Sequence, residues 1–131
     1  MEENEKREEL TDEEKEEKRK EEERREEIKR EKEQYQKRID EETNDLKKFR
    51  EIQEEVDNLN NNLSACINVV SDSIVNVALR KRYETMRQSN RSTYMKANRE
   101  VGNVIDEKEK TITRLQDEKD QLEEKEEKED N

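Results

Sequence analysis

The sequence predicts an all-α protein that folds as a long antiparallel two-helix hairpin of coiled-coil type. Three observations support this prediction. The 131-residue chain has no Pro, one Gly and 53% charged residues. Only 24% of its residues are apolar, which is too few for a thick core but enough for narrow seams along helices. These apolar residues recur at helical spacing in two runs, and a short polar cluster near mid-chain separates the runs.

The first helix is expected to begin at Thr11. The segment from Thr11 to Glu14 has the pattern of a capping box. In this motif the side chain of Thr11 accepts a hydrogen bond from the backbone N–H of Glu14, and the side chain of Glu14 accepts one from the backbone N–H of Thr11. The next twenty residues contain almost no apolar side chain except Ile28, but they hold many opposite charges spaced four apart. A solvated helix that frays at its start is therefore predicted. The resulting domain assignment is 1–34 for a charged helical extension, 35–128 for the hairpin and 129–131 for an acidic tail.

From Ile28 onward the first helix carries a coiled-coil seam, which is predicted to run to about residue 70. Apolar residues fall seven apart, with one interruption at Glu42. This series consists of Ile28, Tyr35, Phe49, Val56, Leu63 and Val70. Three further apolar residues each follow a member of the series by three positions: Ile52, Leu59 and Cys66. Ile39 and Leu46 lie on the flank of the same face. Cys66 is interpreted here as a small buried apolar residue.

The second helix, from about residue 73, has a different period. Its seam positions are separated by four, three and four residues in turn, so equivalent positions recur every eleven residues, at Leu79, Asn90, Val101 and Ile112. An eleven-residue repeat is close to the natural twist of an α-helix and predicts a nearly straight helix. Tyr83, Met86 and Tyr94 belong to this seam. Gly102 is expected to permit the close approach of a neighbouring helix.

The chain is predicted to reverse near Ser71-Asp72-Ser73, with Asp72 or Ser73 as the N-cap of the second helix. In an antiparallel pair, the numbers of facing residues add up to a constant. A turn at Asp72 gives a sum of about 144, which places Leu63 opposite Leu79 and continues this apolar pairing along both helices.

Several kinds of chemistry are not expected. The chain has no His and a single Cys, which excludes His-based catalysis, a thiolate metal cage and an internal disulfide. A thin hairpin offers no cleft that would perturb the pKa of a carboxylate pair. We therefore predict no enzyme activity, no catalytic or metal-binding residues and no cofactor.

Charge and hydropathy narrow the set of partners. A net charge of −11 repels nucleic acid, so no nucleic-acid partner is predicted. The longest weakly charged stretch, 64–79, is too short and too polar to span a bilayer, and no leader precedes the first charged run. A cytoplasmic location is expected, or export with a partner without a cleaved signal peptide.

The apolar flank of the hairpin is wider than one neighbouring helix covers, which predicts that further helices complete a bundle. The weakly charged stretch around the turn is expected to be covered by this partner. The predicted partner-binding residues are Phe49, Val56, Leu63, Ile67, Val70, Ile74, Val75, Leu79, Tyr83, Met86 and Tyr94.

The long charged helix, the weakly charged turn region, a second helix bearing Tyr83 and Tyr94, and the acidic Glu/Lys tail together resemble small helical hairpins of Gram-positive bacteria. Over residues 35–128 the chain resembles the α-helical partners encoded beside LXG-domain toxins of the type VIIb secretion system, relatives of WXG-type hairpins. In this chain Ser71-Asp72-Ser73 replaces the Trp-x-Gly turn of the WXG group, and neither tyrosine begins a Tyr-x-x-x-Asp/Glu signal.

The resemblance implies a non-catalytic partner that binds the N-terminal helical region of an LXG toxin. A second small helical protein would join the complex, which would then be targeted for type VII secretion. The alternative hypothesis is a self-associating scaffold or spacer, in which two hairpins form a homodimeric four-helix bundle.

Overall fold

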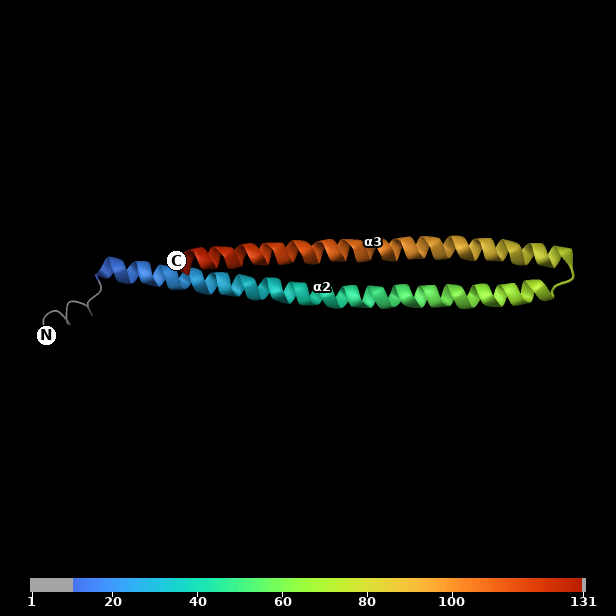
Figure 1. The fold of residues 1–131 in the computed structure, drawn as a ribbon, viewed down its shortest axis with the longest axis horizontal. Coiled ribbons are helices and arrows are strands. Elements are labelled where there is room, and N and C mark those ends of the chain that lie inside the picture. The colour runs from blue at the N-terminus through green and yellow to red at the C-terminus, as the bar shows by residue number, and fades with distance from the viewer. Residues whose placement is uncertain (1–10, 131) are drawn as a thin grey trace. The chain divides into compact units, whose positions relative to one another are not determined.

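The computed structural model describes residues 11–130, with side chains as far as residue 128, and it contains two helices (Figure 1). Helix α2 is Asp12–Ser73 and helix α3 is Val77–Asp130. The helices pack against each other and the described residues form no strand, which confirms the predicted all-α hairpin. The acidic tail predicted for 129–131 and the first ten residues of the predicted extension lie outside the described side chains.

The start of α2 is fixed by the predicted capping box. The hydroxyl of Thr11 accepts a hydrogen bond from the backbone N–H of Glu14, at 3.3 Å, and the Glu14 carboxylate accepts one from the N–H of Thr11, at 3.4 Å. Acidic residues fill the first turn, where they are favourable at the positive end of the helix dipole. The capping prediction is therefore confirmed.

The helices contribute to two compact units. Unit 1 combines α2 up to Asp40 with α3 from Arg114, and unit 2 is Glu41–Thr113. The core of unit 1 includes Ile28, Ile39 and Leu115, of which Leu115 is fully buried. Packing in unit 1 thus already includes Ile28, which lies within the segment predicted as a solvated extension.

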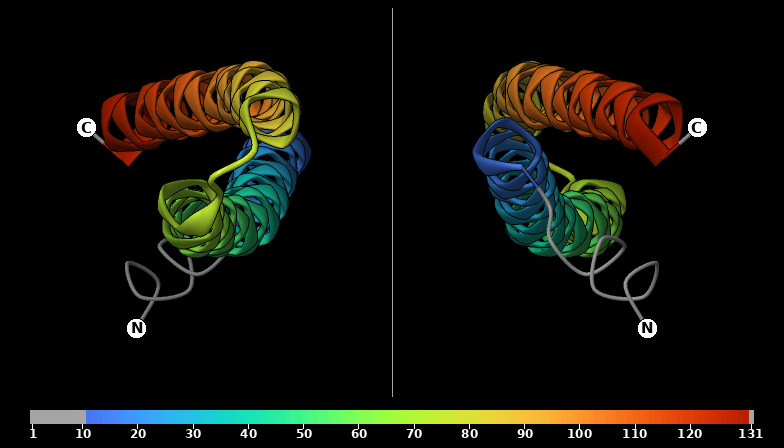
Figure 2. Two further views of the ribbon diagram at one scale, coloured as in Figure 1. Left: turned by 90° about the vertical axis from the view of Figure 1, so that its right-hand side faces the viewer. Right: turned by 90° about the vertical axis from the view of Figure 1, so that its left-hand side faces the viewer.

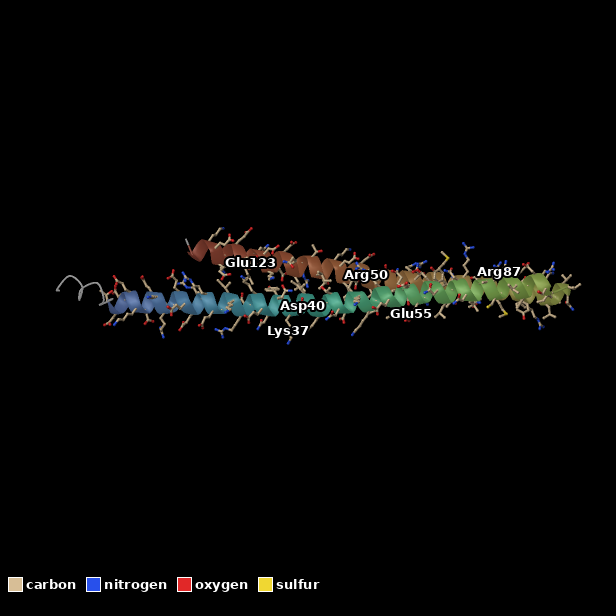
Figure 3. All side chains as sticks on the ribbon, turned by 60° about the horizontal axis from the view of Figure 1, so that its bottom comes forward. Lys37, Asp40, Arg50, Glu55, Arg87 and Glu123 are labelled. Carbon is tan, nitrogen blue, oxygen red and sulfur yellow. The ribbon has the colours of Figure 1, made fainter. Side chains whose placement is uncertain are left out.

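Polar contacts between the helices also hold unit 1 together. The Nζ atoms of Lys32 and Lys119 donate hydrogen bonds to Oε2 of Glu126 and Oε1 of Gln36, each at 2.7 Å. Long basic side chains lie along the apolar seam in this way while their charged ends reach polar partners. Other charged side chains, such as Lys37, project outward (Figure 3).

Unit 2 contains the connection between the helices, which comprises residues 74–76 (Figure 2). Its buried residues are Leu46, Ile67 and Ile105, with Ser71 as a buried polar residue beside the connection. Ser71-Asp72-Ser73 forms the last turn of α2, and the chain reverses directly after it. The hydroxyl of Ser73 donates to the carbonyl of Val69 at 2.9 Å, a bond to the preceding turn that lets serine continue a helix.

The predicted N-cap of the second helix is wrong. Asn76 occupies this position: its Oδ1 accepts hydrogen bonds from the backbone N–H groups of Ala78, at 2.9 Å, and Leu79, at 3.3 Å. Asp72 and Ser73 are still within α2. The second helix accordingly begins at Val77, about four residues later than predicted.

We expect Asn76→Ala to lower the free energy of unfolding by about 1 kcal/mol, because two backbone donors at the start of α3 lose their acceptor. The measurement is urea denaturation followed by circular dichroism. Asn61→Ala is the matched control, because Asn61 is an exposed residue inside α2, where Ala favours the helix. Equal stability of the wild type and Asn76→Ala would contradict the capping role.

The register also differs from the prediction. The Tyr94 hydroxyl donates a hydrogen bond to Asp57, and the Gln53 amide donates one to Asn98. The numbers of facing residues therefore add up to about 151 rather than 144. The reason is geometric, because a reversal over residues 74–76 moves the midpoint of the hairpin beyond Asp72. A difference of seven is one heptad, so apolar residues of α2 still face α3 after the shift.

The seven-residue seam does not follow the helix interface to the end of α2. Beyond Val56, the residues of α2 that are at least half-buried are Asp57, Asn60, Ser64, Ile67 and Ser71. A heptad seam drifts by about 20° per heptad on a straight α-helix. Leu63 and Val70 have consequently rotated out of the interface and are 47% and 40% exposed. The prediction that they pack against the second helix is therefore wrong.

The interpretation of Gly102 is also corrected. A methyl group added at Gly102 would meet no atom within 4 Å, so no neighbouring helix approaches it closely.

Candidate partner-binding surface

A shallow groove runs between the helices of unit 2. It has a volume of about 200 Å³. It is lined by Val56, Leu59, Asn60 and Leu63 from α2 and by Asn90, Thr93, Tyr94 and Ala97 from α3. Tyr94 is its only titratable lining residue, so this surface suits binding rather than acid–base chemistry.

Exposed apolar side chains extend this groove along both helices. An α-helix turns by about 100° per residue, so residues seven or four apart share one sector of its surface. The residues on this sector, which we call the apolar face, are Ile52, Leu59, Leu63 and Val70 of α2 and Leu79 and Met86 of α3. All six are large apolar residues with at least 40% of their surface exposed.

Ten of the eleven predicted partner-binding residues are distributed over three environments in the structure. Four of them, Leu63, Val70, Leu79 and Met86, lie exposed on the apolar face. Phe49, Val56, Tyr83 and Tyr94 are half-buried. Ile74 and Val75 lie in the connection, where Val75 is 94% exposed.

Ile67 requires a correction, because it is only 5% exposed and packs inside unit 2. Its side chain therefore does not belong to a free surface of the hairpin.

The sequence prediction missed Ile52 and Leu59 as surface residues, because it assigned them to the internal seam. Their seven-residue spacing was visible, but spacing alone does not say which neighbour a stripe faces. Cys66 continues the same series and is exposed, so its interpretation as a buried residue is wrong.

Charge on unit 2 is uneven. Residues 59–100 hold seven bases and three acids, and all seven bases lie between Arg80 and Arg99. Within residues 11–128, none of these seven bases forms an ion pair. Arg80 donates to the carbonyl of Ile74 at 2.9 Å, which ties the start of α3 to the connection. The helix α3 therefore carries unneutralised positive charge beside the apolar face.

Polar side chains cross the helix interface at several points within unit 2. Lys108 donates to Oε2 of Glu42 at 2.7 Å and lies 3.5 Å from Oδ2 of Asp45. The hydrogen bond to Glu42, followed by the charge of Glu42 and then Asp45, raises the pKa of Lys108. The hydrogen bond that the Tyr94 hydroxyl donates to Asp57 raises the pKa of Tyr94.

We expect the hairpin to lose stability as the pH rises above about 10. The folded state holds the protons of Tyr94 and Lys108 to a higher pH than the unfolded chain does, so unfolding releases protons in this range and becomes more favourable. Urea midpoints between about pH 8 and pH 11.5 measure the effect. The urea midpoint should decrease less steeply with pH for Tyr94→Phe than for the wild type.

Tyr83→Phe is the matched control for this experiment, because the Tyr83 hydroxyl makes no hydrogen bond with a described residue. If the urea midpoint of Tyr94→Phe depends on pH as that of the wild type does, the hydrogen bond from Tyr94 to Asp57 does not contribute to the pH dependence.

The described residues contain no group of three or more His, Cys, Asp or Glu side chains that could hold a metal ion. Within residues 11–130, no helical stretch combines the length and apolar character that crossing a bilayer requires. Fold and surface together define the class: an all-α helical hairpin with an exposed apolar face. Comparisons with protein-family models, curated proteins and solved structures gave no match to this chain.

Proposed function

We propose that this chain is a non-catalytic helical partner, which binds an α-helix of another protein on the apolar face of unit 2. The observation that carries the proposal is the gathering of six exposed apolar residues on one sector of two packed helices. An apolar patch of this kind, rimmed by polar residues, is typical of a protein-interaction site. Seven-residue spacing on α2 favours a helical ligand, because this spacing presents a coiled-coil seam to a neighbour.

The α2 residues of the apolar face, Ile52, Leu59, Leu63 and Val70, form a stripe whose length determines the length of the client helix. From Ile52 to Val70, α2 advances by about 27 Å at 1.5 Å per residue. A client helix of about 18–20 residues covers this distance. Its apolar residues would repeat at the coiled-coil period and would cover Leu59 and Leu63, the central residues of the stripe.

The client proposed here is the N-terminal helical region of an LXG toxin, and the basis is the resemblance described in the sequence analysis. In this proposal the hairpin meets its client in the cytoplasm, and a second small helical protein completes the complex for type VII secretion. The apolar face supports a helical client, whereas the identity of the client depends on the resemblance.

The direct test is co-expression with the helical region of an LXG toxin from the same locus, followed by size-exclusion chromatography with light scattering. We expect co-elution as a complex of defined mass. Failure to co-elute with any LXG region of that locus, while the hairpin itself is helical by circular dichroism, would refute this client.

One observation favours the alternative, a self-associating scaffold. The apolar face has contributions from both helices, so a second hairpin could cover it in a homodimeric four-helix bundle. Light scattering of the isolated protein over a range of concentrations separates the two functions. A stable dimer that does not exchange for the client would favour the scaffold.

A further inference from the structure

A second groove lies on the other side of the α2–α3 interface in unit 2. It has a volume of about 470 Å³. It is lined by Asn60, Ser64 and Asn68 from α2 and by Arg87, Arg91, Tyr94 and Met95 from α3. Asn60 and Tyr94 line this groove and the apolar groove alike, so they mark the boundary between the two. We call the second groove the arginine groove.

The arginine groove differs from the apolar face in chemistry. Arg87 and Arg91 are four residues apart, so their guanidinium groups leave the same side of α3 one turn apart. Both side chains are exposed, and neither forms an ion pair within residues 11–128. Met95, which is 52% exposed, provides an apolar surface beside them.

We propose that the arginine groove binds an acidic amphipathic helix of another protein. Carboxylates three or four residues apart on the ligand helix would pair with Arg87 and Arg91, because a guanidinium group matches the geometry of a carboxylate. An apolar ligand residue between them would cover Met95. This inference goes beyond the proposed function, which concerns the apolar face on the other side of the interface.

A second copy of the chain fits the groove poorly. Two copies that met through this part of unit 2 would bring the bases of both into contact, with seven bases against three acids in residues 59–100 of each. The acidic stretches of the described residues offer one strongly exposed large apolar residue, Ile52, because all the others lie between Leu59 and Met95. A heterologous helix that carries both acidic and apolar residues meets both requirements.

Nucleic acid is also disfavoured as the occupant. Phosphate binding would use Arg87 and Arg91, but the chain carries a net charge of −11, which repels a polyanion at longer range. The apolar surface of Met95 has no function in contacts to a phosphate backbone.

The experiment measures fluorescence anisotropy with the full chain and a labelled helical peptide of about 20 residues. The peptide carries Glu pairs four residues apart and Leu between them, and a second peptide has every Glu replaced by Gln. An oligodeoxythymidine of the same charge tests phosphate binding. We expect the acidic peptide to bind and the Gln peptide to bind at least about tenfold more weakly, because charge-assisted pairs are lost.

Arg87→Gln/Arg91→Gln should weaken binding of the acidic peptide roughly tenfold. Lys81→Gln/Arg82→Gln is the matched control, because it removes the same charge from α3 outside both grooves. This control should weaken binding less than about threefold. Leu63→Gln, on the apolar face, should leave the affinity for the acidic peptide unchanged, so failure of the toxin client and failure of this inference are distinguishable.

Several results would overturn the inference. One is an acidic peptide that does not bind a chain shown to be helical, or that binds the arginine-substituted chain equally well. Another is an oligonucleotide that binds as tightly as the acidic peptide and depends on the same arginines, which would make the groove a phosphate site. A homodimer that dissociates on Arg87→Gln/Arg91→Gln would assign the groove to a second copy.

Discussion

Leu115→Ala should lower the free energy of unfolding by about 2–5 kcal/mol, the usual cost of truncating a buried leucine. Leu115 has no exposed surface, although it belongs to a thin hairpin. Polar contacts between the helices lie one turn further along α3. Lys119 reaches Gln36 at 2.7 Å, and a hydrogen bond to Glu118 raises the pKa of Tyr35.

The measurement is urea denaturation of the full chain, followed by circular dichroism. Leu59→Ala makes the same chemical change at a residue that is 68% exposed, and it should cost less than about 0.5 kcal/mol. Similar losses for Leu115→Ala and Leu59→Ala would show that unit 1 does not pack around Leu115. If thermal unfolding shows an additional transition at lower temperature for Leu115→Ala alone, its cause would be the same, because the cavity weakens unit 1.

Leu63→Gln should weaken the complex with the helical client roughly tenfold or more. Leu63 lies in the middle of the stripe on α2 and lines the apolar groove, where a client helix would remove it from water. A polar side chain loses this burial and leaves its amide to be satisfied inside the interface. Gln is a good helix former and Leu63 is 47% exposed, so the hairpin itself should remain folded.

Affinity for the co-purified client is measured by isothermal titration calorimetry. Val69→Gln is the matched control, because Val69 is 67% exposed on α2 but lies on the side of the helix away from the groove. Equal affinities of Leu63→Gln and the wild type for the client would show that the apolar face does not form the interface. Equal losses for Leu63→Gln and Val69→Gln would point to a general effect on α2 instead.

The helices and the first cap followed from local chemistry and were therefore predictable. Thr11 and Glu14 are close in sequence, and the hydrogen bonds between them need no other part of the chain. The cap at Asn76 could have been found by the same reasoning, because Asn is a preferred N-cap residue. It was missed because two serines beside Asp72 suggested an earlier turn, whereas all three residues continue α2 and Ser73 hydrogen-bonds the preceding turn.

The surface near the connection shows where sequence patterns stop being sufficient. Leu59 and Leu63 belong to a regular seam, and a seam is normally assigned to the nearest partner helix. In the structure Asn60 and Ser64 are half-buried at this level, whereas the two leucines remain exposed. Apolar spacing specified a helical neighbour for this stripe, but it did not specify which helix.

The sequence by itself determined the all-α class, the two long helices, the first cap and the separation of charge along the chain, because each depends on local composition and spacing. Only the tertiary structure decided the register and which residues remain exposed. A pattern that repeats every seven residues fits α3 nearly as well after a shift of one heptad. Polar contacts, such as those of Lys108 with Glu42 and of Tyr94 with Asp57, occur in the register that the structure adopts.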